Sequence, residues 1–407
     1  MGLRIVYVGA EMRVLVVGGG RWQVPLCEFL LSQDFEIVLV DPSPDAECFR
    51  FAKAMIISDI RNFDTILQEV SSMNDVPSMI LTDQSDLAIE TASRLSHELK
   101  LPGIAPETCK IFRNKWHFRR FLAREFSVTF PRCYQISNKS DLESVVGSLG
   151  LPLVVKPADS QSSRGFSIVS SPDEDLKQVV QKALQHTRLD YVLAEQFIPG
   201  TEITIEGISL SGRHHSLTNS SKMHFRPGIA SRLDYPARIE SGLLAQITKF
   251  HNKLIDATGL ENALTHAEYL VDPLSGNFAP VEMACRGGGN LISSHIVPWM
   301  SGLDTYTILL DALMGNHIDL VPTPTTRCAS LQFFEFRDEI APQVVTATKF
   351  SNFTCKIISE FNIKAGQKIS AATDDRSRHG FAILMAEDIE ILETARKQVE
   401  QIVYEVS

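Results

Sequence analysis

The chain has 407 residues and a formal net charge of −10, from 49 Asp and Glu against 39 Lys and Arg. Hydrophobic residues make up 44% and charged residues 22% of it, a composition typical of a globular protein rather than a disordered or fibrous one. One hydrophobic core rarely holds so long a chain, so we expect several units. The acidic balance argues against a dedicated nucleic-acid-binding protein, because such affinity rests on clustered Lys and Arg.

The seven cysteines form no CxxC pair and have no histidine nearby at zinc spacing. Neither a disulfide framework nor a structural zinc site is therefore indicated, which favours reduced thiols. No apolar run approaches the roughly 20 residues that span a bilayer, and the first residues match neither a signal peptide nor a myristoylation motif. We expect a cytoplasmic protein with no membrane or nucleic-acid partner, and leave a homodimer open.

The first hundred residues alternate short apolar strands with amphipathic helices. The segment RIVYVG at 4–9 is echoed by RVLVVG at 13–18, and we assign the first central strand to the second copy because it feeds a helix. The elements predicted after it are a helix over 24–31, a strand ending at Asp41, a helix over 62–70 and a strand ending at Asp83. This alternation predicts a parallel sheet with helices on both faces, in a Rossmann-like unit.

Three glycines, Gly18 to Gly20, stand at the first strand-to-helix turn. With Gln23 where a third glycine belongs, they form an incomplete GxGxxG fingerprint, and Asp41 lies where a ribose-binding acid would stand. An oxidoreductase that uses this fingerprint is therefore one alternative. Glycines at such a turn also serve merely to make it tight, and we favour that structural interpretation.

The rest of the chain is richer in strands. A basic helix is predicted over 115–126, and short strands from residue 151 onward indicate an antiparallel sheet. Further predicted elements are helices over 173–185, 243–254 and 304–313, strands around HAEYLVD (266–272) and FAPVEMA (278–284), and several short strands followed by a terminal amphipathic helix that contains Leu392 and Ile402.

Two acids, Glu268 and Glu282, are separated by the turn sequence PLSG. They can therefore lie on adjacent antiparallel strands and converge on one point. Two converging carboxylates suit a hard cation, most often magnesium bridged to substrate phosphates. Taken alone, the two acids are equally consistent with surface charges.

Lys156 ends the apolar run LPLVVK, where burying an unpaired ammonium group would be costly. A phosphate partner would explain its position. The loop ADSQSSRGFS that follows offers hydroxyl groups and accessible backbone N–H groups, as a phosphate-covering flap would. The alternative is a plain polar hairpin loop.

In this order, the motifs resemble those of the ATP-grasp superfamily. The matching elements are Lys115, Lys156, the loop 160–165, EQFIPGTE at 195–202, and HAE with EMACRGGG at 266–289. The pattern Glu-x-Ala-x-Arg-x-Gly-Gly is similar to that of L-amino-acid ligases and related carboxylate–amine ligases. The resemblance implies an α/β and α+β multidomain protein with a Rossmann-like N-terminal domain (1–108), an ATP-grasp module of small (109–200) and large (201–325) α+β subdomains, and a C-terminal α+β extension (326–407).

The resemblance also assigns roles to individual residues. ATP phosphates would be bound by Lys115, Lys156, Ser162, Ser163 and Gly165, the adenine edge by the backbone of Glu195, Gln196, Phe197 and Ile198, and the ribose by Glu202. Glu268 and Glu282 would bind Mg²⁺, with Mn²⁺ as an alternative, and Arg286 would neutralise the oxyanion and the transferred phosphoryl group.

The sequence departs from the family pattern at two positions. Ala284 stands where many members have a metal-binding asparagine, so Asn290 or a water would have to complete the metal shell. Ser162 stands in the flap where a glycine is common. The alanine at 284 therefore weakens the prediction of a second metal site.

The implied activity is that of an ADP-forming carboxylate–amine ligase that makes an amide bond through an acyl phosphate, with an amino acid as a substrate. Arg226 could grip a substrate carboxylate, and His224 or His266 could deprotonate the amine. The alternatives are another ATP-grasp ligase, of the purine-pathway or carboxylase type, and a nucleotide-binding regulatory protein without turnover.

Overall fold

The computed structural model describes residues 12–272, 274–321, 326–336, 340–341, 350 and 353–405. The first copy of the N-terminal repeat, at 4–9, lies outside them. Among the described helices, none has the length and apolar character that crossing a membrane requires.

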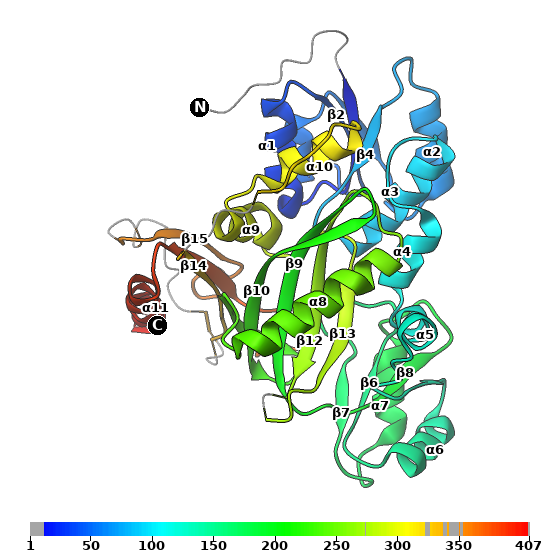
Figure 1. Ribbon diagram of the computed structural model, residues 1–407, viewed down its shortest axis with the longest axis vertical. Helices are drawn as coiled ribbons and strands as arrows, with labels where there is room; N and C mark the ends of the chain where they lie inside the picture. The colour runs from blue at the N-terminus through cyan, green and yellow to red at the C-terminus, as the bar shows by residue number, and fades with distance from the viewer. Residues whose placement is uncertain are drawn as a thin grey trace.

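The N-terminal part is a four-stranded parallel sheet with the order β3-β2-β1-β4, at the top of Figure 1. Its elements are β1 (Arg13–Val17), η1 (Arg21–Gln23), α1 (Val24–Ser32), β2 (Glu36–Asp41), η2 (Glu47–Phe51), β3 (Ala54–Ile57), α2 (Phe63–Ser71), β4 (Met79–Leu81) and α3 (Asp86–Glu98). Residues 14–17 are fully buried, as expected for a parallel strand covered on both faces. The Rossmann-like prediction is confirmed, with the second repeat copy as β1, although β3 was missed.

Two helices connect this sheet to a small antiparallel sheet with the order β5-β8-β6-β7. The elements are α4 (Pro106–Arg113), α5 (Lys115–Phe126), β5 (Cys133–Ile136), α6 (Lys139–Leu149), β6 (Leu153–Lys156), β7 (Ser167–Val169), α7 (Leu176–Leu184) and β8 (Val192–Gln196). Helix α7 begins later than predicted because the Asp175 side chain caps it, accepting from the backbone N–H groups of Lys177 and Gln178.

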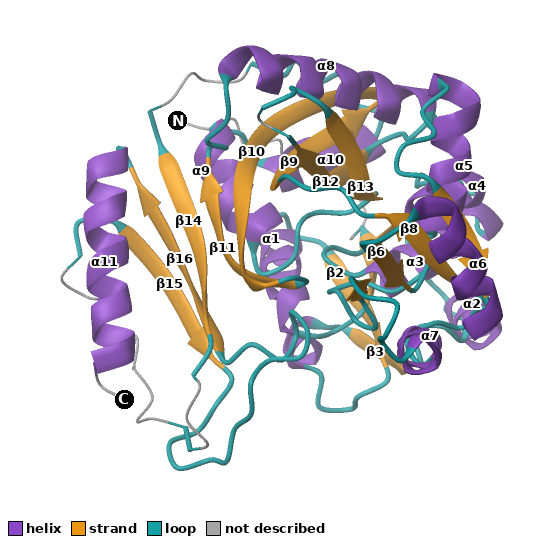
Figure 2. Cartoon of the chain, turned by 90° about the horizontal axis from the view of Figure 1, so that it is seen from below, coloured by secondary structure: helices purple, strands orange, loops and turns teal. Residues whose placement is uncertain are grey.

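An eight-stranded antiparallel sheet, ordered β13-β12-β9-β10-β11-β14-β16-β15, forms the centre of the molecule. Its strands are β9 (Thr201–Leu210), β10 (Arg213–Arg226), β11 (Ile229–Tyr235), β12 (Ala263–Val271), β13 (Phe278–Ala284), β14 (Cys328–Phe334), β15 (Lys356–Phe361) and β16 (Gly380–Ala386). The helices in this part are α8 (Ser241–Ala257), η3 (Ile292–Ile296), α9 (Val297–Ser301), α10 (Thr305–Leu313) and α11 (Ile389–Glu405). Figure 2 shows α8 lying across one end of the sheet and α11 beside β14–β16. The large sheet includes strands from both sides of the predicted boundary at residue 325. The division into four units remains a prediction.

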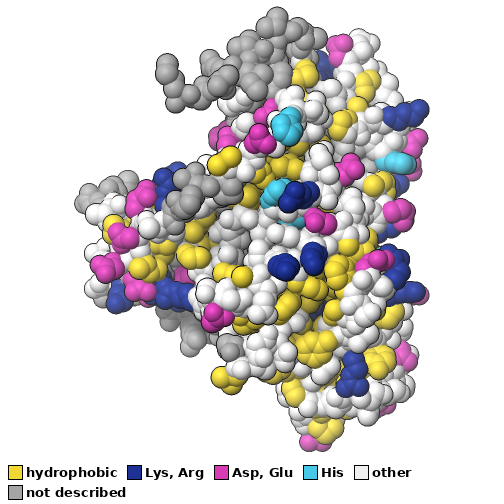
Figure 3. All heavy atoms as spheres, viewed as in Figure 1, with side chains coloured by type: hydrophobic (Ala, Val, Ile, Leu, Met, Phe, Trp, Pro, Cys, Tyr) yellow, Lys and Arg dark blue, Asp and Glu magenta, His cyan; other side chains and the backbone are white. Residues whose placement is uncertain are grey.

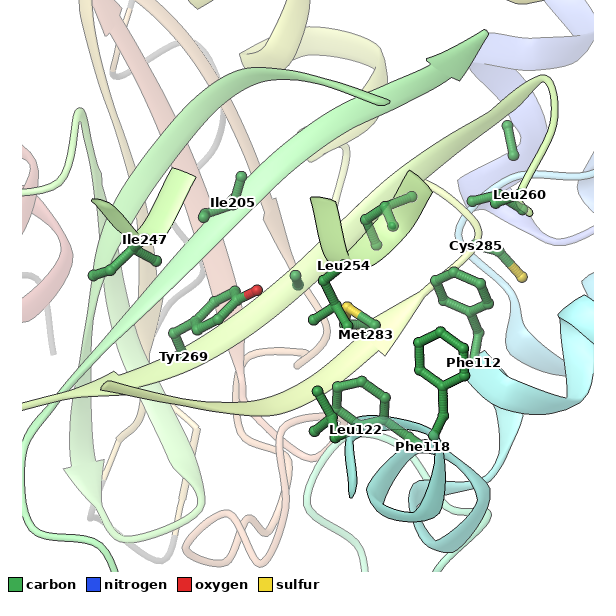
Figure 4. Packing of buried hydrophobic residues seen from close by; sticks show 14 of the residues in the cluster. Phe112, Phe118, Leu122, Ile205, Ile247, Leu254, Leu260, Tyr269, Met283 and Cys285 are labelled. Atoms are coloured by element: carbon green, nitrogen blue, oxygen red, sulfur yellow. The ribbon is translucent and has the colours of Figure 1, made fainter. Parts of the chain in front are cut away.

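The core beneath α8 joins the connecting helices to the large sheet. Phe112 of α4 and Phe118 and Leu122 of α5 pack in one buried cluster with Leu254 of α8 and Met283 of β13 (Figure 4). Since Glu282 is the neighbour of Met283, this packing fixes the part of β13 that carries the predicted metal ligand.

Candidate active site

A pocket of about 490 Å³ lies between the small sheet and the large sheet, and we call it the inter-sheet pocket. Its lining includes Lys115, Arg119, Lys156, Ser160, Ser163, the segment 195–198, Glu202, Lys222, His224, Arg226, Glu268 and Glu282. Most of the predicted site residues are thus brought together. Four predicted site residues are not among the described residues that line this pocket: Ser162, Gly165, His266 and Arg286.

Glu268 and Glu282 are direct partners in the β12–β13 register, so their side chains share one face of the sheet. Lys222 Nζ donates to Glu268 at 2.7 Å, and Lys115 Nζ lies 3.1 Å from Glu282 Oε2. Burial disfavours the charge on Glu268, but Lys222 and His266 outweigh it and hold the pKa of Glu268 well below its usual value. Glu268 is therefore ionised, as a ligand of a hard cation must be.

The described residues include no group of three or more His, Cys, Asp or Glu side chains placed to hold a metal ion. A metal in the inter-sheet pocket would thus have two carboxylate side chains, and its other ligands would come from phosphate and water. That donor set is the usual one for magnesium at a nucleotide. Ala284, which pairs with His266, adds no ligand.

Lys222 was missed in the sequence, although it forms the centre of the pocket's charge network. Its ammonium group donates to Glu202 at 2.5 Å and to Glu268 at 2.7 Å. Burial lowers the pKa of Lys222, but these two carboxylates raise it well above its usual value. Glu202 is also 3.2 Å from His224 Nε2. The feature of the sequence that could have identified Lys222 is its place within the polar strand segment SSKMHFR.

The buried ammonium group of Lys156 has a partner within the protein, which corrects the argument that a phosphate must explain it. Its Nζ lies 2.6 Å from Glu195 Oε2, and Arg119 Nε donates to the same carboxylate at 3.0 Å. Burial raises the pKa of Glu195, but Arg119 and Lys156 lower it to about 2. The Glu195 side chain is thus committed to this ion-pair group rather than to a ligand.

The flap loop adopts backbone conformations that are unusual for its residues. Ser162 and Ser163 have φ of 59° and 56°, and Gly165 has φ of 73°. Left-handed residues in a turn point backbone N–H groups into a concavity that suits an anion. Lys115 Nζ donates to the carbonyl of Ser160 at 2.7 Å, while the buried Ser160 hydroxyl has no hydrogen-bond partner. A glycine, which is common at this position in the family, adopts such a positive φ without strain, whereas Ser162 does not.

Arg286 is held by the N-terminal part of the chain. Its Nε donates to Asp86 Oδ1 at 2.6 Å and its Nη1 to the Gly287 carbonyl at 2.8 Å. Burial lowers the pKa of Arg286, but the nearby Asp86 carboxylate raises it by more, so the guanidinium group is charged. The glycines that follow are packed against the protein itself: a Cβ at Gly287 would lie 2.3 Å from Ser293 Cβ, and one at Gly288 would lie 2.9 Å from Glu206 Oε2.

The three candidate acid–base and carboxylate-binding residues differ in their surroundings. His266 Nδ1 lies 2.6 Å from Glu206 Oε1; burial lowers the pKa of His266, but Glu206 raises it to about 10. A histidine protonated at neutral pH is a donor and does not fit the role of a base. Arg226 donates from both terminal nitrogens to Glu335, each at 2.7 Å, so its guanidinium is already engaged. His224 lines the inter-sheet pocket.

The first glycine run has contacts of a different kind. Gly19 N donates to Asp41 Oδ2 at 2.7 Å, and a Cβ at Gly19 would lie 2.6 Å from Leu39. Three residues after Gly20, the Gln23 side chain exchanges hydrogen bonds with the backbone of Asp83. These contacts agree with the interpretation that the glycines shape a turn, because Asp41 already caps it.

Three comparisons relate the chain to known proteins. The family model described as D-ala D-ala ligase C-terminus matches residues 124–258. A formate-dependent phosphoribosylglycinamide formyltransferase from Prochlorococcus marinus (strain MIT 9515) is 23% identical over 192 residues, covering 46% of this chain and 48% of the relative. A D-alanine–D-alanine ligase from Acinetobacter baumannii is 43% identical over 70 residues, 17% of this chain and 22% of the relative. The chain thus spans about half the length of this formyltransferase and about a fifth of the length of the ligase.

Solved structures match nearly the whole fold. An L-amino acid ligase from Bacillus licheniformis superimposes with a TM-score of 0.78 at 18% identity, covering 97% of this chain and 98% of that one. A phosphoribosylglycinamide synthetase from Anaerococcus prevotii gives 0.71 at 16% identity, with 97% and 98% covered. At these identities the likeness shows the fold alone.

Proposed function

We propose that the chain is an ADP-forming carboxylate–amine ligase of the ATP-grasp superfamily, supported by the family model over residues 124–258 and by the fold of the solved ligases. One observation carries the proposal: two lysines, two glutamates in cross-strand register and a left-handed flap loop surround a single pocket between two antiparallel sheets. This arrangement provides cations for a polyphosphate, acids for a divalent metal, and a backbone that can close over both.

The inter-sheet pocket would hold ATP. The backbone of segment 195–198, at the end of β8, faces the adenine edge, and Glu202 takes the ribose hydroxyls. Lys115, Lys156 and the flap loop with Ser162, Ser163 and Gly165 take the phosphates. Each lysine now pairs with a carboxylate, Lys115 with Glu282 and Lys156 with Glu195. Phosphate oxygens would therefore compete with those pairings.

Magnesium, with manganese as the alternative, would be held by Glu268 and Glu282 and would supply charge neutralisation at the phosphates. Lys115 must then release Glu282 and turn toward phosphate. Lys222 remains between Glu202 and Glu268, where it offsets the negative charge of the acids when no cation is bound.

In the reaction, a substrate carboxylate oxygen attacks the γ-phosphorus of ATP, the bond to ADP breaks, and an acyl phosphate forms. The amine then attacks the acyl carbon, the amide bond forms, and phosphate leaves. Such transfers depend on positioning and charge stabilisation rather than on covalent help from the protein. Arg286, held in one orientation by Asp86, stabilises negative charge on the reacting oxygens, and His224 is the remaining candidate for the amine proton.

An amino acid is the preferred substrate class. The fold of the L-amino acid ligase and the segment shared with D-alanine–D-alanine ligase support this choice. A purine-pathway ligase is the second candidate, supported by the similarity to a phosphoribosylglycinamide formyltransferase over nearly half of the chain. The carboxylase-like alternative is supported by fold similarity alone, to a biotin carboxylase.

The test is a screen of purified protein with Mg-ATP against amino acids and small carboxylates, with phosphate and ADP measured together. We expect release of both only when a carboxylate and an amine are present, and loss of release in Glu282→Gln. Glu143→Gln, on the exposed face of α6, is the matched control and should retain activity. Formation of AMP, or no ATP binding, would rule the proposal out.

A further inference from the structure

A second cavity, which we call the arginine cleft, adjoins the inter-sheet pocket. It has a volume of about 600 Å³ and lies between α3, α4, the flap loop and segment 185–189. Arg164 of the flap loop lines both cavities. The volume is within the range of small-molecule sites, and nothing in the proposed reaction occupies the cleft.

The lining of the arginine cleft is basic in an acidic protein. Six Lys or Arg side chains face three Asp or Glu side chains there, although the whole chain carries a net charge of −10. The basic residues are Arg61, Arg94, Lys110, Arg113, Arg164 and Arg188. On the face in Figure 3, dark blue Lys and Arg side chains gather at the right-hand edge, where Figure 1 places α4 and α5. Such a local excess attracts anions.

Two of the three acidic side chains of the cleft already have hydrogen-bond partners. Asp86 accepts from Arg286 Nε at 2.6 Å, and Asp159 accepts from the hydroxyl of Thr187. Of the basic residues, Arg61 is likewise paired, with Asp59. The local charge excess therefore resides on the other arginines.

Three guanidinium groups in the cleft retain unused donors. Arg113 Nε is buried without a hydrogen bond, since its nearest carboxylate, Glu90, is 3.5 Å away in poor geometry. Arg94 lies 4.0 Å over the ring of Phe63, a contact that leaves its N–H groups free. Among the described residues, the Arg188 side chain has no hydrogen-bond partner. A buried donor without an acceptor is costly, and an acceptor oxygen from a ligand would remove that cost.

We propose that the arginine cleft binds a small phosphorylated molecule, with Arg94, Arg113 and Arg188 around the phosphoryl group. Several arginine forks suit a phosphoryl group, which offers three oxygens, better than they suit a single carboxylate. Asp86 connects the cleft to the proposed reaction centre, because its second oxygen lies 3.7 Å from Arg113 while its first holds Arg286. A ligand here lies one side chain away from Arg286.

The test is calorimetric titration of the full chain with ribose 5-phosphate, without metal or ATP, and with ribose as the uncharged control. Ribose 5-phosphate should bind and ribose should not. Arg94→Gln and Arg188→Gln should each raise the Kd about tenfold, the usual effect of losing a charge-assisted hydrogen bond. Both side chains are exposed, so neither substitution threatens folding.

Two further variants separate the arginine cleft from the inter-sheet pocket. Arg124→Gln, an exposed arginine on α5 outside the cleft, should leave the Kd unchanged. Lys156→Gln should weaken ATP binding and leave the Kd for ribose 5-phosphate unchanged. Absence of binding, or loss of binding in Lys156→Gln with the cleft variants unaffected, would overturn the proposal. Because no turnover is measured, this result is independent of whether the chain is a ligase.

Discussion

The two glycine runs both follow a strand, yet they lie in different surroundings. Around Gly19 the close neighbours, Leu39 and Asp41, belong to the same small parallel sheet. Around Gly287 they come from other elements: Asp83 from the N-terminal part and Ser293 from η3. The first run shapes one turn, whereas the second is the place where separate parts of the chain meet beside Arg286. Three glycines in a row therefore do not by themselves indicate a phosphate site.

The largest expected difference between the runs concerns catalysis. Arg286→Gln should reduce kcat/KM of the proposed ligase by about 10²- to 10³-fold, since a fixed charge at the reacting oxygens is lost. Asp41→Asn, beside the first run, should change it by less than about threefold because Asp41 only caps a turn. Steady-state phosphate release measures both. Equal losses in the two variants would contradict the contrast.

The next largest expected effect is on stability, through packing at the second glycine run. Gly287→Ala should lower the free energy of unfolding by about 1–3 kcal/mol, because the added methyl group meets Ser293 and Asp83. Gly289→Ala is the matched control, since a Cβ there has no neighbour within 4 Å. Urea denaturation of both variants measures the difference, and equal midpoints would show that the loop adjusts freely.

The charge pair beneath Gly288 should make stability depend on pH. Because the folded-state pKa of His266 is raised from 6.5 to about 10, its contribution is fully present below pH 6.5 and is lost as pH rises toward 10. The stability difference between the wild type and His266→Gln should therefore shrink between pH 7 and pH 9, by about 1 kcal/mol per pH unit. A difference that is constant with pH would mean that His266 is neutral.

The smallest expected effect is at the first run. Gly19→Ala should cost about 1 kcal/mol, because the flexible end of Leu39 can move away from the new methyl group. Gly20→Ala should cost nothing measurable, since the space beside it is open. Thermal unfolding of the pair checks this. A loss at Gly20 as large as at Gly19 would show that backbone conformation, not space, requires the glycines.

Local patterns were sufficient for much of the fold. Strand–helix alternation predicted the parallel sheet, and the short PLSG turn predicted that Glu268 and Glu282 would be neighbours, which the β12–β13 register confirms. These features depend on residues close in sequence. The period and the turn length are therefore readable from one chain.

The partners of the buried charges were not predictable. Lys156 pairs with Glu195 on β8, and Arg286 pairs with Asp86, which is 200 positions earlier in the chain. Only the tertiary fold brings such groups together. The sequence alone could show that Lys156 needed a partner but could not identify it, and it contained no sign that Glu206 would keep His266 protonated.

Arg119 has a mechanical consequence for the inter-sheet pocket. One side chain on α5 donates to Glu195 on β8 of the small sheet and to the carbonyls of Pro280 and Val281 on β13 of the large sheet. These hydrogen bonds therefore connect the two sheets beside the inter-sheet pocket. Separating the small sheet from the large sheet would therefore require these three hydrogen bonds to break.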